Sequence, residues 1–458
     1  MPDLRRIIAR NRAGEAIAIP SVCTAHAQAL EASLTLAEAL DQPLVVEATS
    51  NQVNQDGGYT GLTPAGFIGF VWDIAARAGV SPSRLLFGGD HLGPQAWRHL
   101  PAGQAMDKAH RMVADYAAAG FTKIHLDCSE GCAGDSPQLP DAVTATRSAA
   151  LAATALAHAP DPAALLFVIG TEVPPPGGAR ARPPGGHPPP PPANPAAPPP
   201  APPRPRPGPG HPRGGARADD HGQIPPTTPE SAAATLAAHR DAFRAEGIPL
   251  DRIGGLVVQP GVEFSPMEVH HLPLARDPGL LSALADWPGL CLEAHSTDYQ
   301  HPAAYPRLAE LGFAFQKVGP ALTFAWREAL YALDTIRAQN GWASGPSLPD
   351  TMEAVMLANP THWQAHVHGQ TADSRTERHF GLADRIRYYW PAPAAEQAVA
   401  RLLADLDDRR LPDPLLAAHF RAEEIALARE SRHSLPRALA LARVQTALRP
   451  YFFTGSRP

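Results

Sequence analysis

The sequence predicts an α/β protein built on a (β/α)8 TIM barrel, with a C-terminal α-helical extension and a disordered Pro-rich insertion. Eight short apolar runs indicate parallel strands that are buried on both faces. Segments with apolar residues at helical spacing alternate with these runs. The chain has 458 residues, which exceeds the roughly 250 residues of one barrel, so a further module is expected.

The predicted strands are short, and each ends in a polar cluster. The alternative architecture is an open, doubly wound sheet, which usually carries a Gly-rich phosphate loop after its first strand. The sequence SVCTAHAQ that ends the first run contains no such loop, and this favours the barrel. In chain order the runs lie at 17–22, 43–48, 84–89, 123–127, 165–170, 255–260, 290–295 and 313–318.

The intervening segments predict eight helices. The segment 63–78 has the clearest start, because Thr63 is suited to an N-cap and Pro64 to the first turn. The eight segments lie at 25–40, 63–78, 106–119, 142–158, 228–246, 279–286, 304–311 and 322–339.

Two segments depart from the barrel pattern. We expect 1–344 to form the barrel, and 345–458, which is rich in Arg, Ala and Leu, to form helices packed against it. Residues 174–217 interrupt the barrel with mainly Pro, Gly, Ala and Arg, which cannot bury enough apolar surface to fold. The pentapeptide Gly-Gly-Ala-Arg-Ala at 177–181 recurs at 214–218. This repeat favours a neutral expansion of the loop over a ligand for a partner's polyproline-binding module.

The composition argues against several classes of protein. The 39 basic and 45 acidic residues give a net charge of −6, which is unlike a nucleic-acid-binding surface. No stretch reaches the roughly 18 apolar residues that a membrane helix requires. The charged N-terminus lacks a signal-peptide pattern, so a cytoplasmic location is expected. The four cysteines are too few for a disulfide framework and predict reduced thiols.

Every predicted strand ends in polar residues, at the rim where barrels build their active sites. A single such residue means little, because a strand-end Asp is often a helix cap and a lone His is often a hydrogen-bonded wall residue. The complete ring favours a catalytic or ligand-binding site. Its members are Cys23, Thr24, His26, Glu47, Ser50, Asn51, Gln52, Asp90, His91, Asp127, Ser129, Glu172, Gln259, Glu263, Glu293, His295, Ser296, Asp298 and Lys317.

Imidazole and carboxylate groups within this ring are suited to a divalent metal ion such as Zn, Mn, Co or Ni. The expected ligands are His91, Glu172, Glu293 and His295. Asp90 adjoins one of them, and we expect it to act as the acid/base on a metal-bound substrate.

The other polar ends are expected to serve catalysis and substrate binding. Glu47 and Asp298 are the further catalytic candidates. In Lys317-Val-Gly-Pro-Ala-Leu-Thr, Lys317 supplies positive charge and Gly319 lets the backbone approach a phosphate at a helix start. A plain strand-to-helix turn is the alternative. Further substrate contacts are expected from Asn51, Gln52, Gln259 and Ser296.

The extension contains two motifs rich in polar and aromatic side chains. HWQAHVHG carries His362, His366 and His368, and DRIRYYW lies at 384–390. Nothing in the sequence places either motif at the barrel mouth. We therefore expect a packed interface against the barrel in preference to a role in the site.

Nine motifs together resemble those of the GatZ/KbaZ family, the Z-subunit proteins of tagatose-bisphosphate aldolase. They extend from about residue 20 to about residue 391, and the Pro-rich insertion, directly after GTEVP, is the one departure; it could lengthen a lip of the active site. The motifs are SVCTAH, VEATSNQVNQDGGYTGLTP, GGDHLGP, KIHLDCS, VIGTEVP, VVQPGVEF, EAHSTDYQ, KVGPALTF and RIRYYWP.

The resemblance implies a TIM barrel and a role in D-tagatose 6-phosphate or galactitol breakdown. One implied activity is metal-dependent epimerisation at C4, which converts D-tagatose 6-phosphate to D-fructose 6-phosphate. The alternative is a non-catalytic partner that a class II tagatose-1,6-bisphosphate aldolase chain needs for full activity. A kinase label also used for the family finds no support, because the sequence has no Gly-x-x-x-x-Gly-Lys-Ser/Thr loop.

The chemistry of C4 favours a retro-aldol route for the epimerase. The ketone at C2 acidifies the proton on C3 but not the one on C4, and no dinucleotide fingerprint suggests oxidation. The pair Asp90-His91 resembles the Asp-His pair of class II aldolases, in which His binds the metal and Asp is the acid/base. By the same resemblance, Lys317 would hold the 6-phosphate.

Overall fold

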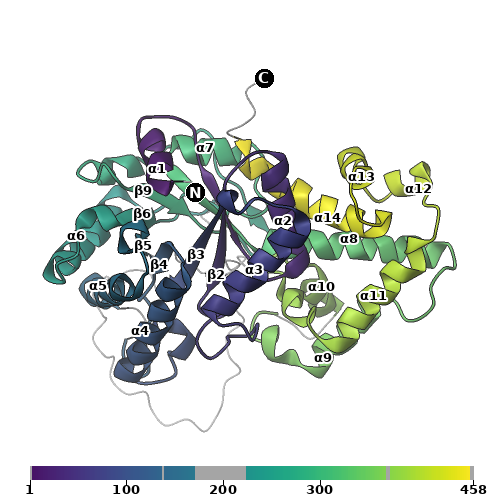
Figure 1. The fold of residues 1–458 in the computed structure, drawn as a ribbon, viewed down its shortest axis with the longest axis horizontal. Helices are drawn as coiled ribbons and strands as arrows, with labels where there is room; N and C mark the ends of the chain where they lie inside the picture. Colours follow the sequence, from purple (N-terminus) through teal and green to yellow (C-terminus); the bar gives the residue numbers. More distant parts are fainter. Residues whose placement is uncertain (1–2, 137–138, 171–222, 368–371, 454–458) are drawn as a thin grey trace, which may run out of the picture.

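The computed structural model describes residues 3–136, 139–170, 223–367 and 372–453 (Figure 1). The predicted insertion at 174–217 lies outside the described residues, as do Glu172 and His368. Eight parallel strands close into a barrel, which confirms the predicted fold class. None of the described helices is long and apolar enough to cross a membrane.

The barrel strands follow one another in chain order, and the last pairs with the first. Each predicted run overlaps one of them. A two-stranded antiparallel pair, β7 (Glu263–Phe264) and β8 (Val269–His270), follows β6 along the chain. The barrel strands are β1 (Ile19–Cys23), β2 (Leu44–Thr49), β3 (Leu85–Leu92), β4 (Lys123–Leu126), β5 (Leu166–Gly170), β6 (Ile253–Val257), β9 (Cys291–Ala294) and β10 (Phe313–Val318).

The helices form where the sequence predicts them, with one exception. The segment 279–286 contains only a short 3-10 helix, η5, because Gly279 is left-handed (φ 70°) and Pro288 follows closely. Thr63 caps α3 through its side chain, as predicted. The helices that follow the strands are α2 (Ala27–Ala39), α3 (Pro64–Ala78), α4 (Ala102–Ala119), α5 (Asp141–His158), α6 (Pro229–Ala245), η5 (Leu280–Leu284), α7 (Ala304–Glu310) and α8 (Pro320–Gln339).

The barrel interior has an apolar end and a charged end. Helix α1 (Leu4–Arg12) precedes the barrel, and its side chains share one buried cluster with Leu86, Val168 and Phe315 from the strands. Beyond this apolar layer the buried side chains inside the barrel are instead ionisable, and they include Glu47, Lys123 and Glu293. The apolar layer therefore stabilises the barrel, while the ionisable side chains lie on the side where the candidate site is expected.

The strand register makes room for these buried charges. Cys23 on β1 pairs with Glu47 on β2, and Glu47 pairs with Gly88 on β3. A Cβ at Gly88 would lie 2.8 Å from the Glu47 Cγ. The glycine therefore allows a carboxylate to lie inside the barrel, where a larger residue would collide with it.

The C-terminal helices gather on one side of the barrel, beside α8 (Figure 1). Helix α14 packs against both α8 and α2. The predicted division of the chain at 344/345 stays a prediction. The helices are α9 (Leu348–Ala358), α10 (Ala372–Phe380), η7 (Arg385–Tyr389), α11 (Pro393–Asp407), α12 (Asp413–Ala417), α13 (Ala422–Arg429) and α14 (Leu435–Leu448).

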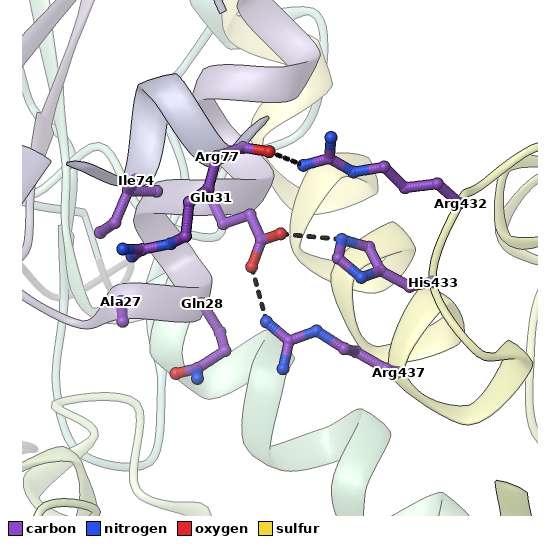
Figure 2. Close-up of a pocket in the computed structure, with 8 residues that line it drawn as sticks. All are labelled: Ala27, Gln28, Glu31, Ile74, Arg77, Arg432, His433 and Arg437. Atoms are coloured by element: carbon purple, nitrogen blue, oxygen red, sulfur yellow. Dashed lines mark hydrogen bonds and ion pairs between the residues drawn. The ribbon is translucent and has the colours of Figure 1, made fainter. Parts of the chain in front are cut away.

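A cavity of about 530 Å³, which we call the flank pocket, lies where residues 432–437 meet α2 and α3 (Figure 2). Glu31 on α2 pairs with His433 at 2.8 Å and with Arg437 at 2.7 Å. Arg432 donates to the backbone carbonyl of Arg77 on α3. These polar contacts attach the C-terminal helices to the barrel.

Candidate active site

A second cavity, of about 850 Å³, opens at the carboxyl ends of the strands, and we refer to it as the mouth cavity. Side chains from β1, β2, β3 and β10 and from the loop after β9 line it, together with residues beyond 360. It therefore lies where the polar ring was predicted. The predicted site residues that line it are Asn51, Gln52, Asp90, His91, Ser296, Asp298, Lys317 and Gly319.

Three imidazoles and one carboxylate meet at the inner end of this cavity. Asp90, His91, His125 and His295 each offer one ligand atom, and these atoms lie within 4.8 Å of one another. The ring centroids of His91 and His295 are 5.1 Å apart. Those of His125 are 4.7 Å from His91 and 5.3 Å from His295. This donor set fits a zinc-type divalent ion, so two of the predicted ligands, His91 and His295, are brought together.

Carboxylates orient two of these imidazoles. The His91 Nδ1 lies 2.8 Å from the Asp127 Oδ2, and the His295 Nε2 lies 2.9 Å from the Glu293 Oε1. A carboxylate accepts the ring N–H, so the lone pair of each neutral ring is on its other nitrogen. Glu293 therefore holds a ligand, which is the usual arrangement around a metal-binding histidine, although it was predicted to be a ligand itself.

His125 is the main residue that sequence reasoning missed. It lies inside β4, where its Nε2 donates to the Gly170 carbonyl at 2.9 Å. Its Nδ1 accepts the His91 backbone N–H at 3.2 Å and lies 3.0 Å from the Asp90 Oδ1. The prediction considered only residues at strand ends. The signal was present in KIHLD, because Lys123, His125 and Asp127 alternate along one strand face.

A buried lysine joins the two glutamates of the ring. The Lys123 Nζ lies 2.6 Å from the Glu47 Oε1 and 2.6 Å from the Glu293 Oε2, and all three side chains are fully buried. Burial would raise the pKa of Glu293, but Lys123 and His295 outweigh it and lower that pKa. Glu47, predicted to be catalytic, is thus placed in an ion-pair layer beneath the cavity.

Asp90 lies between the imidazoles and a second lysine. Lys317 Nζ contacts the Asp90 Oδ1, and the Cys23 thiol lies 3.5 Å from the Oδ2. Burial alone would raise the pKa of Asp90, but His91 and Lys317 hold it well below its usual range. His91 itself has a left-handed backbone (φ 47°), a strain that is concentrated at functional positions. Asp90 is therefore an ionised carboxylate at the edge of the imidazole cluster.

The predicted phosphate contacts are occupied by protein groups. The ammonium of Lys317 points to Asp90 and lies 3.8 Å from the Glu47 Oε2. The backbone N–H groups of Gly319 and Ala321, at the start of α8, donate to the Asp298 Oδ1 at 3.0 and 2.9 Å. Asp298, predicted to be catalytic, thus caps this helix. Its burial raises its pKa to about 6.

The predicted amide contacts differ in their surroundings. Gln259 is not among the residues that line the mouth cavity, and its Oε1 accepts the N–H groups of Gly261 and Val262 at 2.8 and 3.0 Å. The Gln52 Oε1 accepts the Thr49 N–H at 2.8 Å. Asn51 is exposed in the mouth cavity. Of these amides, Asn51 is the one most available to a ligand.

The C-terminal segment forms part of the mouth, where nothing in the sequence placed it. Arg385, Arg387 and Tyr388 line the mouth cavity, as does His366. The motif DRIRYYW also packs against α8 through Asp384, as expected, so it combines packing with a place in the wall of the mouth. Sequence patterns could not reveal this contact, because it joins segments that are far apart in the chain and depends on how the helices fold back.

The fold and the site together define the class of this protein. It is a TIM-barrel protein with an imidazole–carboxylate cluster suited to a divalent metal at the carboxyl ends of its strands. The chain belongs to the D-tagatose-1,6-bisphosphate aldolase subunit GatZ/KbaZ-like family, whose model matches residues 4–184 and 207–456. The resemblance in the motifs is thereby confirmed, and the chain is related to proteins of carbohydrate metabolism.

One solved structure resembles this chain over nearly its whole length. A protein described as a "probable tagatose 6 phosphate kinase" from Sinorhizobium meliloti 1021 is 41% identical, with a TM-score of 0.80, and the match covers 96% of this chain and 100% of that one. The fructose-bisphosphate aldolase of Campylobacter jejuni is 13% identical, with coverage of 88% and 95%, but its TM-score of 0.41 is too low to inform function.

Proposed function

We propose that the protein is a metal-dependent 4-epimerase that converts D-tagatose 6-phosphate to D-fructose 6-phosphate by retro-aldol and aldol steps. The observation that carries this proposal is the position of the Asp90 carboxylate, which lies beside the clustered imidazoles of His91, His125 and His295. A base next to a metal-type donor set is what cleavage beside a ketone requires. Membership of an aldolase-subunit family is consistent with it.

The residues of the cluster have distinct parts in this reaction. His91, His125 and His295 would hold the divalent ion, which when bound supplies Lewis-acid stabilisation of negative charge on the C2 oxygen. Glu293 and Asp127 fix the ring orientations of His295 and His91 through the hydrogen bonds described above.

Asp90 handles the proton of the C4 hydroxyl. As the C3–C4 bond breaks, its electron pair passes toward the C2 carbonyl, the C4 hydroxyl becomes an aldehyde, and an Asp90 oxygen accepts the released proton. The aldehyde fragment turns over its face, the C3–C4 bond re-forms, and Asp90 returns the proton to the C4 oxygen. Lys317, in contact with Asp90, keeps the carboxylate ionised between these steps.

The proposal is tested with the purified protein, stripped of metal and reloaded separately with Mn, Co, Ni or Zn. We expect conversion of tagatose 6-phosphate to fructose 6-phosphate with at least one of these ions. Entry of labelled dihydroxyacetone into the product during turnover would show that the C3–C4 bond is broken. Absence of turnover and of bound metal with all four ions would reject the proposal.

A histidine variant tests the donor set separately from turnover. His125→Ala should lose bound metal while the protein stays folded, because it removes one of three imidazoles. His433→Ala, in the flank pocket, is the matched control and should retain the metal. Elemental analysis and a thermal melt measure both properties. Equal metal content in the two variants would contradict the ligand assignment.

An accessory role is the second candidate, favoured by the family description as an aldolase subunit. It predicts a stable complex with a class II tagatose-bisphosphate aldolase chain and a rise in aldolase activity. Asp90→Asn should then stimulate the partner as well as the natural chain does. Size-exclusion chromatography without a shared peak would count against this candidate.

A further inference from the structure

Two arginines that line the mouth cavity form no ion pair with any acid of the described residues. Within the described parts of the chain, neither Arg385 nor Arg387 lies within ion-pair distance of a carboxylate. By contrast, Arg337, Arg378 and Arg443 each pair with an Asp or Glu at 3.0 Å or less. These three arginines are held by acids, whereas the two arginines of the mouth form no such pair within the described residues.

One tyrosine brings the two guanidinium groups together. Arg387 Nη2 donates to the Tyr388 hydroxyl oxygen at 2.9 Å, and Arg385 Nη1 donates to the same oxygen at 3.3 Å. Both groups also lie over the Tyr388 ring, at 4.5 and 4.6 Å from its centroid. Two like charges that share one hydroxyl repel each other, so an anion between them would stabilise the arrangement.

The barrel holds this segment firmly in place. Asp384, which precedes the arginines, has a left-handed backbone (φ 46°) and accepts the Thr323 hydroxyl of α8. The fully buried Arg327 of α8 lies 3.8 Å from the other Asp384 oxygen. Leu382 accepts the Tyr299 hydroxyl at 2.7 Å. The arginines are thus preorganised by α8, the helix that follows β10 and Lys317.

We propose that Arg385 and Arg387, with the Tyr388 hydroxyl between them, bind the terminal phosphate of the sugar substrate. This inference rests on the proposed function and assigns the substrate's anionic end to the C-terminal segment. Lys317 and the start of α8 are engaged by Asp90 and Asp298, whereas these two arginines line the cavity without an ion pair to any described acid. The guanidinium fork suits phosphate oxygens, and the tyrosine hydroxyl, accepting from both arginines, still has its own proton to donate.

The test compares Arg385→Gln and Arg387→Gln with Arg437→Gln of the flank pocket as the matched control. The KM and kcat of each are measured with tagatose 6-phosphate and with unphosphorylated tagatose. Each mouth variant should raise the KM for the phosphorylated sugar about 10- to 100-fold, because charge-assisted hydrogen bonds are lost, with little change in kcat. The KM for tagatose should stay unchanged, and Arg437→Gln should leave both sugars unaffected.

Binding measurements separate this inference from the proposed function. Calorimetric binding of tagatose 6-phosphate and of inorganic phosphate needs no turnover, and both should weaken in the mouth variants. If the natural protein shows no epimerisation but this binding depends on the arginines, the inference stands and the proposed function fails. Arg385→Lys, which keeps the charge, should restore part of the phosphate affinity.

Three results would overturn the inference. An equal loss with tagatose and its 6-phosphate would mean that the arginines only support the structure. Unchanged phosphate binding in both mouth variants would show that the anion binds elsewhere. Tighter arginine-dependent binding of a ketohexose with a terminal carboxylate would reassign the site to a sugar acid.

Discussion

The mouth cavity and the flank pocket are both rich in arginine, but their charges are arranged differently. In the flank pocket, Glu31 meets His433 and Arg437, and Arg432 reaches a backbone carbonyl (Figure 2). In the mouth, Arg385 and Arg387 have no acid partner within the described residues. In the flank pocket a shared acid links His433 and Arg437 to the barrel, whereas no described acid pairs with either arginine of the mouth.

A second difference lies in the depth of the charges. The ion pairs of the flank pocket keep 13–33% of each side chain exposed, whereas Lys123, Glu47 and Glu293 beneath the mouth are fully buried. Charges in a low-dielectric interior depend strongly on each other, because no water replaces a missing partner. Substitutions at the mouth should therefore have much larger effects than substitutions at the flank.

The largest effect is expected at Asp90. Asp90→Asn removes the proposed proton acceptor while keeping the shape of the side chain, so kcat should fall by about 10²–10⁴-fold. Steady-state kinetics with tagatose 6-phosphate measure it, and a thermal melt checks the fold. Gln28→Ala in the flank pocket is the control. A kcat for Asp90→Asn within a few-fold of the natural value would contradict the proposed role.

Lys123 should dominate the stability of the mouth. Lys123→Met leaves Glu47 and Glu293 buried without their shared cation, which should lower the free energy of unfolding by about 3–5 kcal/mol. Denaturant unfolding measures the change. The triple variant with Glu47→Gln and Glu293→Gln removes the unpaired charges as well, and should recover part of the loss. A loss below about 1 kcal/mol in the single variant would mean that the Lys123 ion pairs stabilise the fold no more than exposed ion pairs do, and the prediction would be wrong.

Asp298 gives the mouth a distinct pH dependence. Its pKa rises from the ordinary 3.8 to about 6 in the folded protein, so the folded state binds the proton more tightly. This tighter binding adds to the free energy of unfolding below pH 3.8. The contribution, roughly 3 kcal/mol in total, is lost as the pH rises through about 6. Asp298→Asn should therefore be more stable than the natural chain at pH 7, with the gain vanishing near pH 4.

A carboxylate with the opposite shift serves as the control for Asp298. Hydrogen bonds from Ser344 and Arg337 outweigh partial burial and lower the pKa of Asp405. Asp405→Asn should therefore be less stable than the natural chain at neutral pH, and the difference should shrink in acid. Chemical unfolding across pH 4–8 measures both variants. If both substitutions changed the free energy of unfolding in the same direction at neutral pH, the link between burial and the Asp298 pKa would be contradicted.

The barrel could be predicted from the sequence because its strands are buried on both faces and therefore consist of continuous apolar runs. The same rule does not predict the segment 279–286, where prolines and a left-handed Gly279 leave room only for η5. Local patterns thus predict which segments are strands and helices, but short segments between turn residues depend on backbone conformations that the pattern does not contain.

The site was only partly predictable for a different reason. Asp90, His91 and His295 were predicted to lie at the rim because they end or follow the predicted apolar runs, and every barrel strand ends at the same rim. His125 was missed because it lies within β4, and the glutamates were given roles at the surface of the site although they pair with Lys123. The arginines at 385 and 387 reach the mouth through folding of the C-terminal helices, which no strand-end rule describes.

The smallest effect is expected at the flank. Glu31→Gln weakens two ion pairs whose partners are 24% and 33% exposed, so the free energy of unfolding should fall by at most about 1 kcal/mol. The loss should shrink in high salt, because exposed charges are screened. Glu310→Gln, which affects the exposed pair with Arg307, is the matched control and should cost still less. Neither variant should alter the KM for tagatose 6-phosphate. A large effect of Glu31→Gln on that KM would show that the flank pocket communicates with the mouth, and the functional separation of the two arginine-rich cavities would then be wrong.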